Sequence, residues 1–415
     1  MALAQKNNTK QDRKIDCDCD LVIVGGGITG VTLAAALKDS GLRIAIVEAN
    51  PKEVTAARKR AYALSILSSR ILDGVGVWDK ILPQIGKYRR VRLSDADYSQ
   101  VIKFQTKDLQ EDYLGYVAQH QTVLESLHEF VDRCENVTWL CPAKAIAIDY
   151  QNSGAEVTVE IGQEIRQIKA KLVVGADGPK SPIREAAGIT TRGWKYWQSC
   201  VTFTIKHNAE TNDTAFERFW PTGPMGILPL PGNRCQIVWT APHQRAKEIQ
   251  ELDEQEFIAK LEYHTGGLLG KIELDSDRLV FPVKLMQSDR YTKSRLALVG
   301  DAAHCCHPLG GQGLNLGIRD AAALAQVLSR AKERGEDIGD LKVLKRYENW
   351  RKLENLAILA LTDSLNRMFS NNFLPLVLLR RLGLWVANYL PPLKIFALKV
   401  MTGLKGRRPE LSIKS

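Results

Sequence analysis

The chain has 415 residues, of which 45% are hydrophobic and 25% charged, and its formal net charge is +10. The composition is that of a globular protein too long for one ordinary core, so we expect two domains and an appended segment. The eight cysteines include no CxxC pair, which argues against a disulfide framework and favours a reducing cytoplasm. Metal ligands normally need spacer residues between them, so the run His304-Cys305-Cys306-His307 predicts no metal site.

The chain opens with a polar stretch, residues 1–18, that lacks periodicity and the apolar core of a secretory signal, so a disordered tail is expected. An apolar run, Cys19 to Val24, then predicts a buried strand. A glycine-rich turn follows, and an alanine- and leucine-rich helix is expected over 31–37. A second strand, Leu42 to Val47, ends at Glu48.

The turn has the spacing GxGxxG, formed by Gly25, Gly27 and Gly30. In this motif the first glycine makes the turn, the second lets the backbone approach a pyrophosphate, and the third lets the helix pack on the strand. The phosphates would lie at the helix N-terminus, and Glu48 could accept hydrogen bonds from a ribose. A turn without a ligand is the alternative, but strand, helix and acid all accompany the glycines. The motif does not distinguish NAD from FAD.

Two later strands, expected over 171–174 and 296–299, also end in polar loops, and the second loop leads into an alanine-rich helix over 317–328. The residues of these loops could bind a nucleotide or merely cap turns. They are Asp177, Gly178, Asp301, Pro308, Gly310, Gly311, Gln312, Gly313, Leu314 and Asn315. Arg58 and Arg60 precede the segment 61–65 and are equally consistent with a solvated loop.

Residues 192–290 have a different pattern, with strands expected over 201–205, 215–219, 237–240 and 279–283 and turns between them. We expect a mostly antiparallel sheet above the nucleotide, joined by a piece around 88–104. A substrate pocket would lie under this sheet, although each candidate could equally be ordinary sheet core. The candidates are Phe219, Trp220, Met225, Leu228 and Pro229.

Between Ser364 and Pro409 the chain has no Asp or Glu, and basic residues alternate with large apolar ones. Arg380-Arg381 and Pro391-Pro392 interrupt the apolar runs, so none reaches the ~20 residues that a membrane span needs. We expect an amphipathic helical segment over 366–415. It either lies on a membrane surface or packs on the body with a basic edge, and both interpretations stay open. No nucleic-acid-binding module is recognised, so no nucleic acid is expected.

Taken together, these motifs resemble the class A FAD-dependent monooxygenases, which have the para-hydroxybenzoate hydroxylase fold. Within this class the sequence is most similar to the ubiquinone-biosynthesis hydroxylase family. The phrase GDAAHCCHPLGGQGLNLGIRDA carries most of the likeness, and TDSLNRMFSNNFLPLVLLRRLG and LPPLKIFALKVMTGL are similar to that family's C-terminal region. The resemblance covers the chain from about Cys19 to Leu404.

The resemblance implies an α/β fold with a discontinuous Rossmann-like FAD-binding domain over 19–85, 105–191 and 291–365. The substrate domain would comprise 86–104 and 192–290. It assigns Gly25, Gly27, Gly30 and Glu48 to the ADP end of FAD. Arg60 and Asp301 are assigned to the ribityl region, Asp177 and Gly178 to FAD and the nicotinamide cofactor, and Gly310 to Leu314 to the flavin pyrimidine edge. The other expected FAD-binding residues are Arg58, Gln121, Pro308 and Asn315. Gln121 stands where many relatives carry arginine.

The implied activity is hydroxylation of an aromatic ring with NAD(P)H as a transient reductant and dioxygen as co-substrate. The expected substrate is a prenylated phenol of ubiquinone or related quinone biosynthesis. The expected location is the cytoplasm, including the cytoplasmic face of a membrane. A prenyl reductase or epoxidase of the same fold, and an inactive membrane-surface scaffold, are the alternatives. The sequence does not predict the catalytic base, because His304 beside the FAD motif could be structural.

Overall fold

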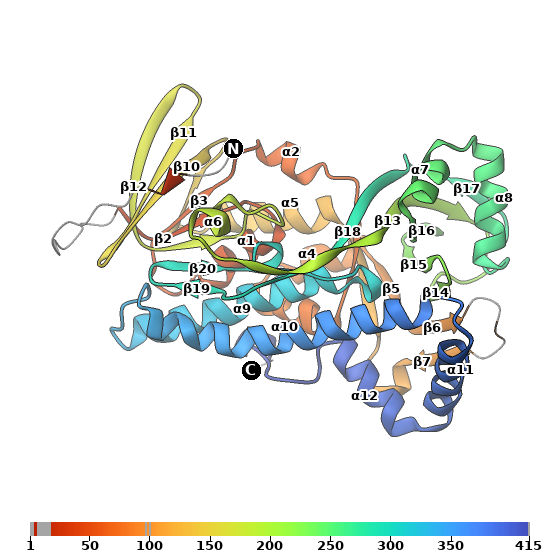
Figure 1. Ribbon diagram of the computed structural model, residues 1–415. Coiled ribbons are helices and arrows are strands. Elements are labelled where there is room, and N and C mark those ends of the chain that lie inside the picture. The colour runs from red at the N-terminus through yellow and green to blue at the C-terminus, as the bar shows by residue number, and fades with distance from the viewer. Residues whose placement is uncertain (1–3, 6–17, 96–97, 99–100, 414–415) are drawn as a thin grey trace.

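The computed structural model describes residues 4–5, 18–95, 98 and 101–413. The predicted disordered tail therefore lies outside the described residues, apart from Asp18 and the short strand β1 (Ala4–Gln5), which pairs with β10. The rest of the chain forms two large sheets at opposite ends of an elongated molecule, and helix α10 runs along both of them (Figure 1).

The first sheet is built around β2, and its strand order is β1-β10-β11-β12-β2-β3-β9. Strand β20 also pairs with β12, on the edge opposite to β2. Within this sheet, β20, β12, β2, β3 and β9 form a parallel group. The connection from β2 to β3 is the helix α1, as a parallel crossover requires. The bounds are β2 (Cys19–Val24), β3 (Ile44–Val47), β9 (Val137–Leu140), β10 (Lys144–Gln151), β11 (Gly154–Ile161), β12 (Glu164–Gly175), β19 (Thr292–Lys293) and β20 (Leu296–Leu298).

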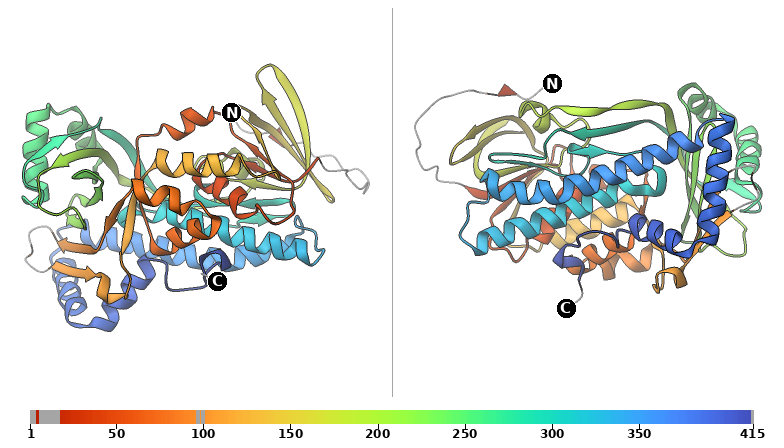
Figure 2. Two further views of the ribbon diagram at one scale, coloured as in Figure 1. Left: turned by 180° about the vertical axis from the view of Figure 1, so that it is seen from behind. Right: turned by 60° about the horizontal axis from the view of Figure 1, so that its bottom comes forward.

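The carboxyl ends of β2, β12 and β20 meet at one edge of this sheet, because the three strands are neighbours and parallel. Helix α1 follows the first of these ends and packs against α5 and α9, with α10 lying beside α9 (Figure 2). The helices of this half are α1 (Ile28–Ala36), α2 (Lys52–Ala56), α3 (Ile66–Val75), α4 (Trp78–Ile81), α5 (His120–Val131), α6 (Pro182–Ala186), α9 (Gln312–Glu333) and α10 (Leu341–Phe369).

The second sheet has the order β21-β18-β13-β16-β15-β14-β6-β7, and β17 pairs with β13. It is mixed but mostly antiparallel, as predicted, because only the β14–β6 pair on this path is parallel. The bounds are β6 (Arg90–Asp95), β7 (Val101–Gln105), β13 (Thr191–His207), β14 (Thr214–Trp220), β15 (Gly223–Leu230), β16 (Arg234–Pro242), β17 (Ile272–Leu274), β18 (Leu279–Ser288) and β21 (His304–Cys305).

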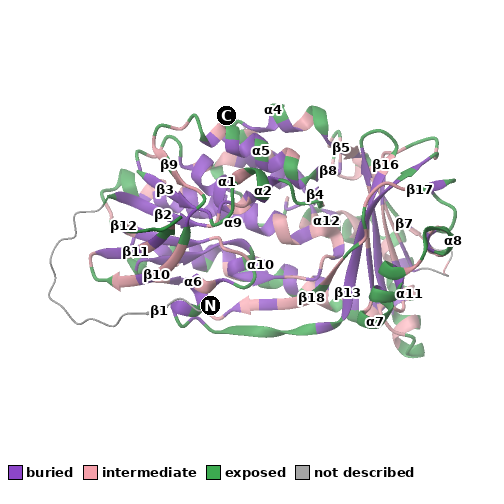
Figure 3. Cartoon of the chain, turned by 90° about the horizontal axis from the view of Figure 1, so that it is seen from above, coloured by how far each residue is buried: buried purple, intermediate pink, exposed green. Residues whose placement is uncertain are grey.

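One face of the second sheet is covered by α7 (His243–Glu251) and α8 (Glu254–Thr265), and its strands are largely buried (Figure 3). A small sheet of β4 (Ala61–Leu64), β8 (Gly115–Gln119) and β5 (Gly86–Tyr88) joins the two halves. The C-terminal part is helical, as predicted, and consists of α11 (Leu374–Tyr389) and α12 (Pro391–Met401), which lie beside β6 and β7 (Figure 1).

Several predicted bounds are wrong by a few residues. Helix α9 begins five residues earlier than expected, at Gln312, because Gly311 in the left-handed conformation (φ 61°) makes its N-cap. Helix α1 likewise begins at Ile28 instead of residue 31. Strand β15 was not predicted, since Gly223, Pro224 and Pro229 are unusual in a strand that lies between two others.

Candidate active site

The glycine turn after β2 has the geometry that a dinucleotide loop needs. A Cβ atom on Gly25 would lie 2.4 Å from the carbonyl oxygen of Ala176, and one on Gly30 would lie 2.1 Å from that of Gly25. Both positions therefore require glycine for packing of the backbone. A Cβ on Gly27 would meet no atom within 4 Å, so this position faces open space at the N-terminus of α1.

Glu48, at the end of β3, holds the same turn from the side. Its Oε2 accepts a hydrogen bond from the N–H of Gly26 at 2.7 Å, and its Oε1 accepts one from the N–H of Asn50 at 2.9 Å. Oε1 also accepts from Nδ2 of Asn50 at 3.2 Å and from Oγ1 of Thr55 at 3.5 Å, so Oε2 is the oxygen that retains a lone pair. Contact with a ribose thus stays a prediction, and the contacts within the protein fix the carboxylate beside the loop.

The three loop regions meet around a cavity of about 350 Å³ between the two sheets. Most of the predicted FAD-binding residues line it: Gly27, Arg58, Arg60, Gly178, Asp301, Pro308, Gly310, Gly311, Gly313 and Leu314. The second sheet closes it from the opposite side with Thr202, Glu217, Pro224, Gly226, Leu228, Gln236, Val238, Thr240 and Phe281. The guanidinium of Arg60 lies 4.9 Å from the ring centre of Phe281 and so connects the two sides.

The two aspartates of the later motifs have different surroundings. The side chain of Asp301 is exposed to the cavity, and desolvation by the protein around it raises the pKa of its carboxyl. Asp177 is turned the other way: its Oδ2 accepts a hydrogen bond from the N–H of Ile183 in α6 at 3.1 Å. Its Oδ1 is buried without a hydrogen-bond partner among the described residues.

Seven predicted residues do not line this cavity: Gly25, Gly30, Glu48 and Asp177, whose contacts are given above, and Gln121, Gln312 and Asn315. Gln121 is exposed, donates to Glu125 at 2.8 Å and lines an adjoining polar cavity of about 340 Å³, which Arg58 and Arg60 also line. Gln312 donates to the carbonyl oxygen of Gly310 at 3.0 Å, and Asn315 donates to that of Gly311 at 2.8 Å. Both side chains are buried and shape the loop.

Helix α9 presents its N-terminus to the cavity, because Gly311, Gly313 and Leu314 line it. No side chain caps this end, so its first N–H groups remain available to a ligand. A helix N-terminus stabilises negative charge, which a reduced flavin carries on its pyrimidine edge. The open space at Gly27, the exposed Asp301 and this helix end together fit FAD.

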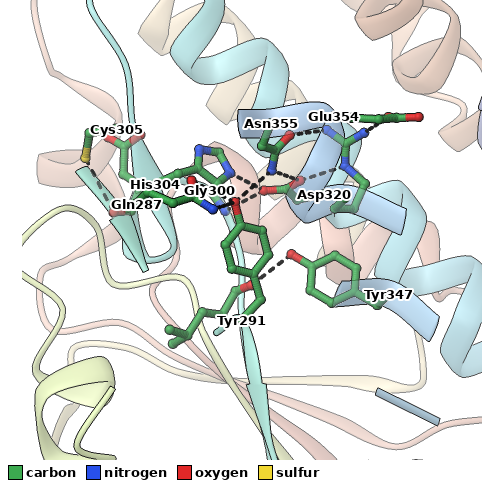
Figure 4. A network of polar contacts seen from close by, with 12 residues as sticks. Gln287, Tyr291, Gly300, His304, Cys305, Asp320, Tyr347, Glu354 and Asn355 are labelled. Carbon is green, nitrogen blue, oxygen red and sulfur yellow. Dashed lines mark hydrogen bonds and ion pairs between the residues drawn. The ribbon is translucent and has the colours of Figure 1, made fainter. Parts of the chain in front are cut away.

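A buried polar network supports the loop that carries Asp301 (Figure 4). Oδ2 of Asp320 in α9 accepts hydrogen bonds from His304 and from the N–H of Gly300, and its Oδ1 accepts from Arg351 at 2.8 Å. Burial alone would raise the pKa of Asp320, but His304 and Arg351 hold it well below its ordinary value. His304 is therefore enclosed in a structural network, and it does not line the cavity.

A second cavity of about 530 Å³ adjoins the first and has an almost wholly apolar lining. The two cavities share Ala63, Glu217, Leu228, Leu309 and Gly310. The second one continues between the sheet and the C-terminal helices, where its lining includes Tyr88, Val91, Leu93, Ile102, Phe104, Phe219, Leu365, Met368, Phe369, Leu379, Leu384, Leu393 and Leu398.

Of the predicted pocket residues, Phe219 and Leu228 line this space and Trp220 and Met225 do not. Trp220 and Met225 pack in the core under α7 and α8, because alternate residues of a strand point to opposite faces. Pro229 shares the face of Met225 by the same alternation. Glu217, which also lines this space, was not predicted, although the alternation places it on the same face as Phe219.

Comparisons with known proteins agree with this geometry. The sequence profile of the FAD binding domain family matches residues 18–359. A Synechocystis sp. protein named "Uncharacterized protein slr1300" is 53% identical over 96% of both chains. Ubiquinone hydroxylase UbiL of Rhodospirillum rubrum is 36% identical, with 94% of this chain and 91% of the relative covered.

The crystal structure of p-nitrophenol 4-monooxygenase PnpA from Pseudomonas putida is 21% identical and superposes with a TM-score of 0.79, over 94% of this chain and 98% of that one. This likeness shows the fold. The chain belongs to the family of FAD-dependent monooxygenases that carry this FAD binding domain and include the ubiquinone-biosynthesis hydroxylases. No helix among the described residues is long and apolar enough to cross a membrane.

Proposed function

We propose that the protein uses NAD(P)H and dioxygen to hydroxylate the ring of a prenylated phenol or hydroquinone. One atom of dioxygen enters the ring as a hydroxyl group, the other leaves as water, and NAD(P)H supplies the two electrons. Bound FAD would supply the redox chemistry between these partners. The name of the relative UbiL, a ubiquinone hydroxylase, supports this substrate class.

The observation that carries the proposal is that two cavities adjoin. We call the cavity of about 350 Å³ the FAD-side cavity and the cavity of about 530 Å³ the apolar cavity. A phenolic ring at the shared wall formed by Glu217, Leu228 and Gly310 would lie next to the flavin. An aliphatic chain attached to that ring would then extend between the second sheet and helices α10, α11 and α12. The chain's transfer from water to this apolar lining contributes about 0.8 kcal/mol for each buried CH₂ group. A small polar phenol would leave most of this cavity unfilled.

The protein's own residues would bind and orient the two molecules and exclude water. Gly27 and the N-terminus of α1 would receive the pyrophosphate, and Asp301 would accept hydrogen bonds from the ribityl chain. The roof formed by Thr202, Val238 and Phe281 would keep bulk water from the ring.

The test uses the full chain loaded with FAD, NADH or NADPH, and a phenol that bears a geranyl chain. In ¹⁸O₂, we expect NAD(P)H oxidation that depends on the phenol and a product with one labelled oxygen on the ring, identified by mass spectrometry. Catalase added to the assay separates hydroxylation from release of hydrogen peroxide. The same phenol without its geranyl chain is the matched control, and it should bind more weakly.

Other products would contradict the proposal in recognisable ways. Saturation of the chain without oxygen consumption would identify a prenyl reductase, and oxygen on the chain would identify an epoxidase. A chain that does not retain FAD would leave only a scaffold role.

We further propose that the enzyme binds the lipid surface in which such a substrate dissolves. Helices α11 and α12 expose ten large apolar side chains, each with at least 47% of its surface accessible. We call them the α11–α12 patch: Phe373, Leu374, Leu378, Leu379, Leu382, Trp385, Tyr389, Leu390, Leu393 and Phe396. Leu379 and Leu393 also line the apolar cavity, so the patch lies at its wall. An aliphatic chain could then enter directly from lipid.

Charges around the patch favour an anionic lipid surface, with one correction to the sequence analysis. Arg380 is buried and forms a bidentate pair with Asp95, Arg381 also contacts Asp95, and Lys394 pairs with Asp108. These three therefore fix the helices to the second sheet. Lys399, Lys405, Arg407 and Arg408 are the basic residues between the patch and Pro409. Of these, Lys405 lies 5.6 Å from the ring centre of Phe396 in the patch, whereas Arg407 packs over Trp350 of α10.

A further inference from the structure

Glu217 is the acidic residue of the second sheet that reaches the space between the two cavities. On β14, Ala215, Glu217 and Phe219 line the apolar cavity, whereas Trp220 packs in the core under α7 and α8. Phe216 contacts both that core and the apolar cavity. Glu217 lines both the FAD-side cavity and the apolar cavity. A substrate ring at the shared wall would therefore lie against its carboxyl group.

The carboxyl group of Glu217 has few polar contacts within the protein to replace the water that it loses on burial. Its Oε2 accepts one hydrogen bond, from the N–H of Gly310 at 3.3 Å, and none of the ion pairs found within residues 18–95 and 101–413 involves it. A carboxylate offers about four acceptor positions, so most remain for a ligand. A half-buried acid with a single weak backbone contact contributes little to folding, which points to a role in binding or chemistry.

We propose that Glu217 is the proton acceptor for the substrate's ring hydroxyl group. This inference rests on the proposed function. In the step, the hydroxyl O–H bond breaks, its proton passes to the carboxylate, and the electron pair stays on the ring oxygen. The resulting phenolate is more electron-rich at the ring carbon that receives oxygen, and the neutral acid of Glu217 then donates a hydrogen bond to the phenolate. The proton returns to the ring oxygen after hydroxylation.

The electrostatic surroundings suit this role. Burial raises the pKa of Glu217 to about 7, with a small opposing effect of the Gly310 N–H, and an acceptor works best when its pKa lies near the working pH. On β13, the Cys200 thiol is close enough to interact with Glu217, and burial raises its pKa to about 12, so it stays neutral. Across the FAD-side cavity stand Arg60 and Asp301, and toward the C-terminal helices stand Arg380 and Lys394, both paired with aspartates.

The alternative role for Glu217 is to hold the Gly310 loop, and two variants separate the roles. Glu217→Gln keeps an oxygen that can accept from the Gly310 N–H but cannot take a proton. Glu217→Asp keeps a carboxylate at a shorter reach. Each is loaded with FAD and assayed with geranyl phenol and NAD(P)H from pH 5.5 to about 9, which brackets the ordinary working range. Glu164→Gln, an exposed acid on β12, is the matched control.

For the wild type, we expect the hydroxylation rate to rise as the pH passes about 7. Glu217→Gln should bind FAD normally, lose this rise, and form product on the order of a hundredfold more slowly, with peroxide in place of product. Glu217→Asp should retain the rise at reduced rate. Wild-type hydroxylation and pH dependence in Glu217→Gln would overturn the inference. Loss of FAD binding in both variants would also overturn it, in favour of the loop-holding role. If the wild type itself forms no ring-hydroxylated product, the proposed function has failed instead.

Discussion

Nε2 of His304 lies 2.5 Å from Oδ2 of Asp320, and both side chains are buried. The contact joins the loop after β20 to helix α9, so the two elements that flank the FAD-side cavity are fixed to each other beneath it. The same carboxylate pairs with Arg351 of α10. Asp320 thus holds together the residues of α9, α10 and β21 that pack beneath the loop of Asp301.

Asp320→Ala is expected to cost about 3–5 kcal/mol in the free energy of unfolding. The reason is that it leaves buried Arg351 without one of its two acidic partners, and leaves His304 and the N–H of Gly300 without their buried acceptor. Denaturant titration measures this difference. Glu164→Ala removes an exposed pair with Arg166 and should cost at most about 1 kcal/mol. Equal stability of the two variants would show that the buried network does not support the loop.

The glycine turn allows a prediction that separates binding from folding. Gly27→Ala places a methyl group in open space, so the protein should fold normally and lose FAD, because the methyl group occupies the approach of the pyrophosphate. Gly30→Ala drives a methyl group into the carbonyl of Gly25 and should lower the melting temperature itself. The flavin-to-protein absorbance ratio and thermal unfolding distinguish the two. Full FAD content in a stable Gly27→Ala protein would contradict the assigned role.

Local sequence motifs made the part of the fold around the first sheet predictable. Gly25, Gly27 and Gly30 follow a strand and begin a helix, and the reasons for their spacing lie within a few residues of them. The loops at Gly178 and Asp301 were recognised in the same way, and the structure brings these distant segments to one cavity.

The second sheet was harder to predict because its two faces are both apolar. Nothing local shows that α7 and α8 cover Trp220 and Met225 while Phe219 and Leu228 face the cavity. The burial of Arg380 within the basic C-terminal segment could not be predicted, because its partner, Asp95, is 285 residues away in sequence. Glu217 was overlooked for a similar reason, since a lone acid in a strand usually faces water.

Asp301 and Asp177 should differ when each is replaced by alanine. Asp301→Ala removes an acceptor exposed to the cavity, and FAD affinity should fall about 10- to 100-fold, as for a hydrogen bond to a charged group. Asp177→Ala removes the partner of the Ile183 N–H and should lower stability by about 1 kcal/mol. Fluorescence titration with FAD measures the first effect and denaturant unfolding the second. Unchanged FAD affinity in Asp301→Ala would remove it from the site.

The position of Glu217 predicts how stability depends on pH. Its folded-state pKa, about 7, lies above the ordinary value of 4.5, so the folded protein binds this proton more tightly than the unfolded chain. The contribution is fully present below about pH 4.5 and is lost as the pH rises through about 7. Wild-type melting temperature should therefore fall relative to that of Glu217→Gln across this window and then run parallel to it. Parallel curves throughout would mean that the carboxyl group is not desolvated.

The α11–α12 patch predicts vesicle binding that point variants can remove. Truncation after about Asn366 would be a poor test, because it also removes Arg380 and the cavity wall at Leu384 and Leu398. Leu378→Glu combined with Leu382→Glu places two charges on the exposed face and should reduce binding to vesicles with anionic lipid by at least about tenfold. Activity on a short-chain phenol should stay unchanged, because neither residue lines the FAD-side cavity or the apolar cavity. The matched control is Leu353→Glu on α10, which is 71% exposed and lies outside the patch, and it should leave binding intact. Equal vesicle binding by all three proteins in a sedimentation assay would mean that this face does not contact lipid.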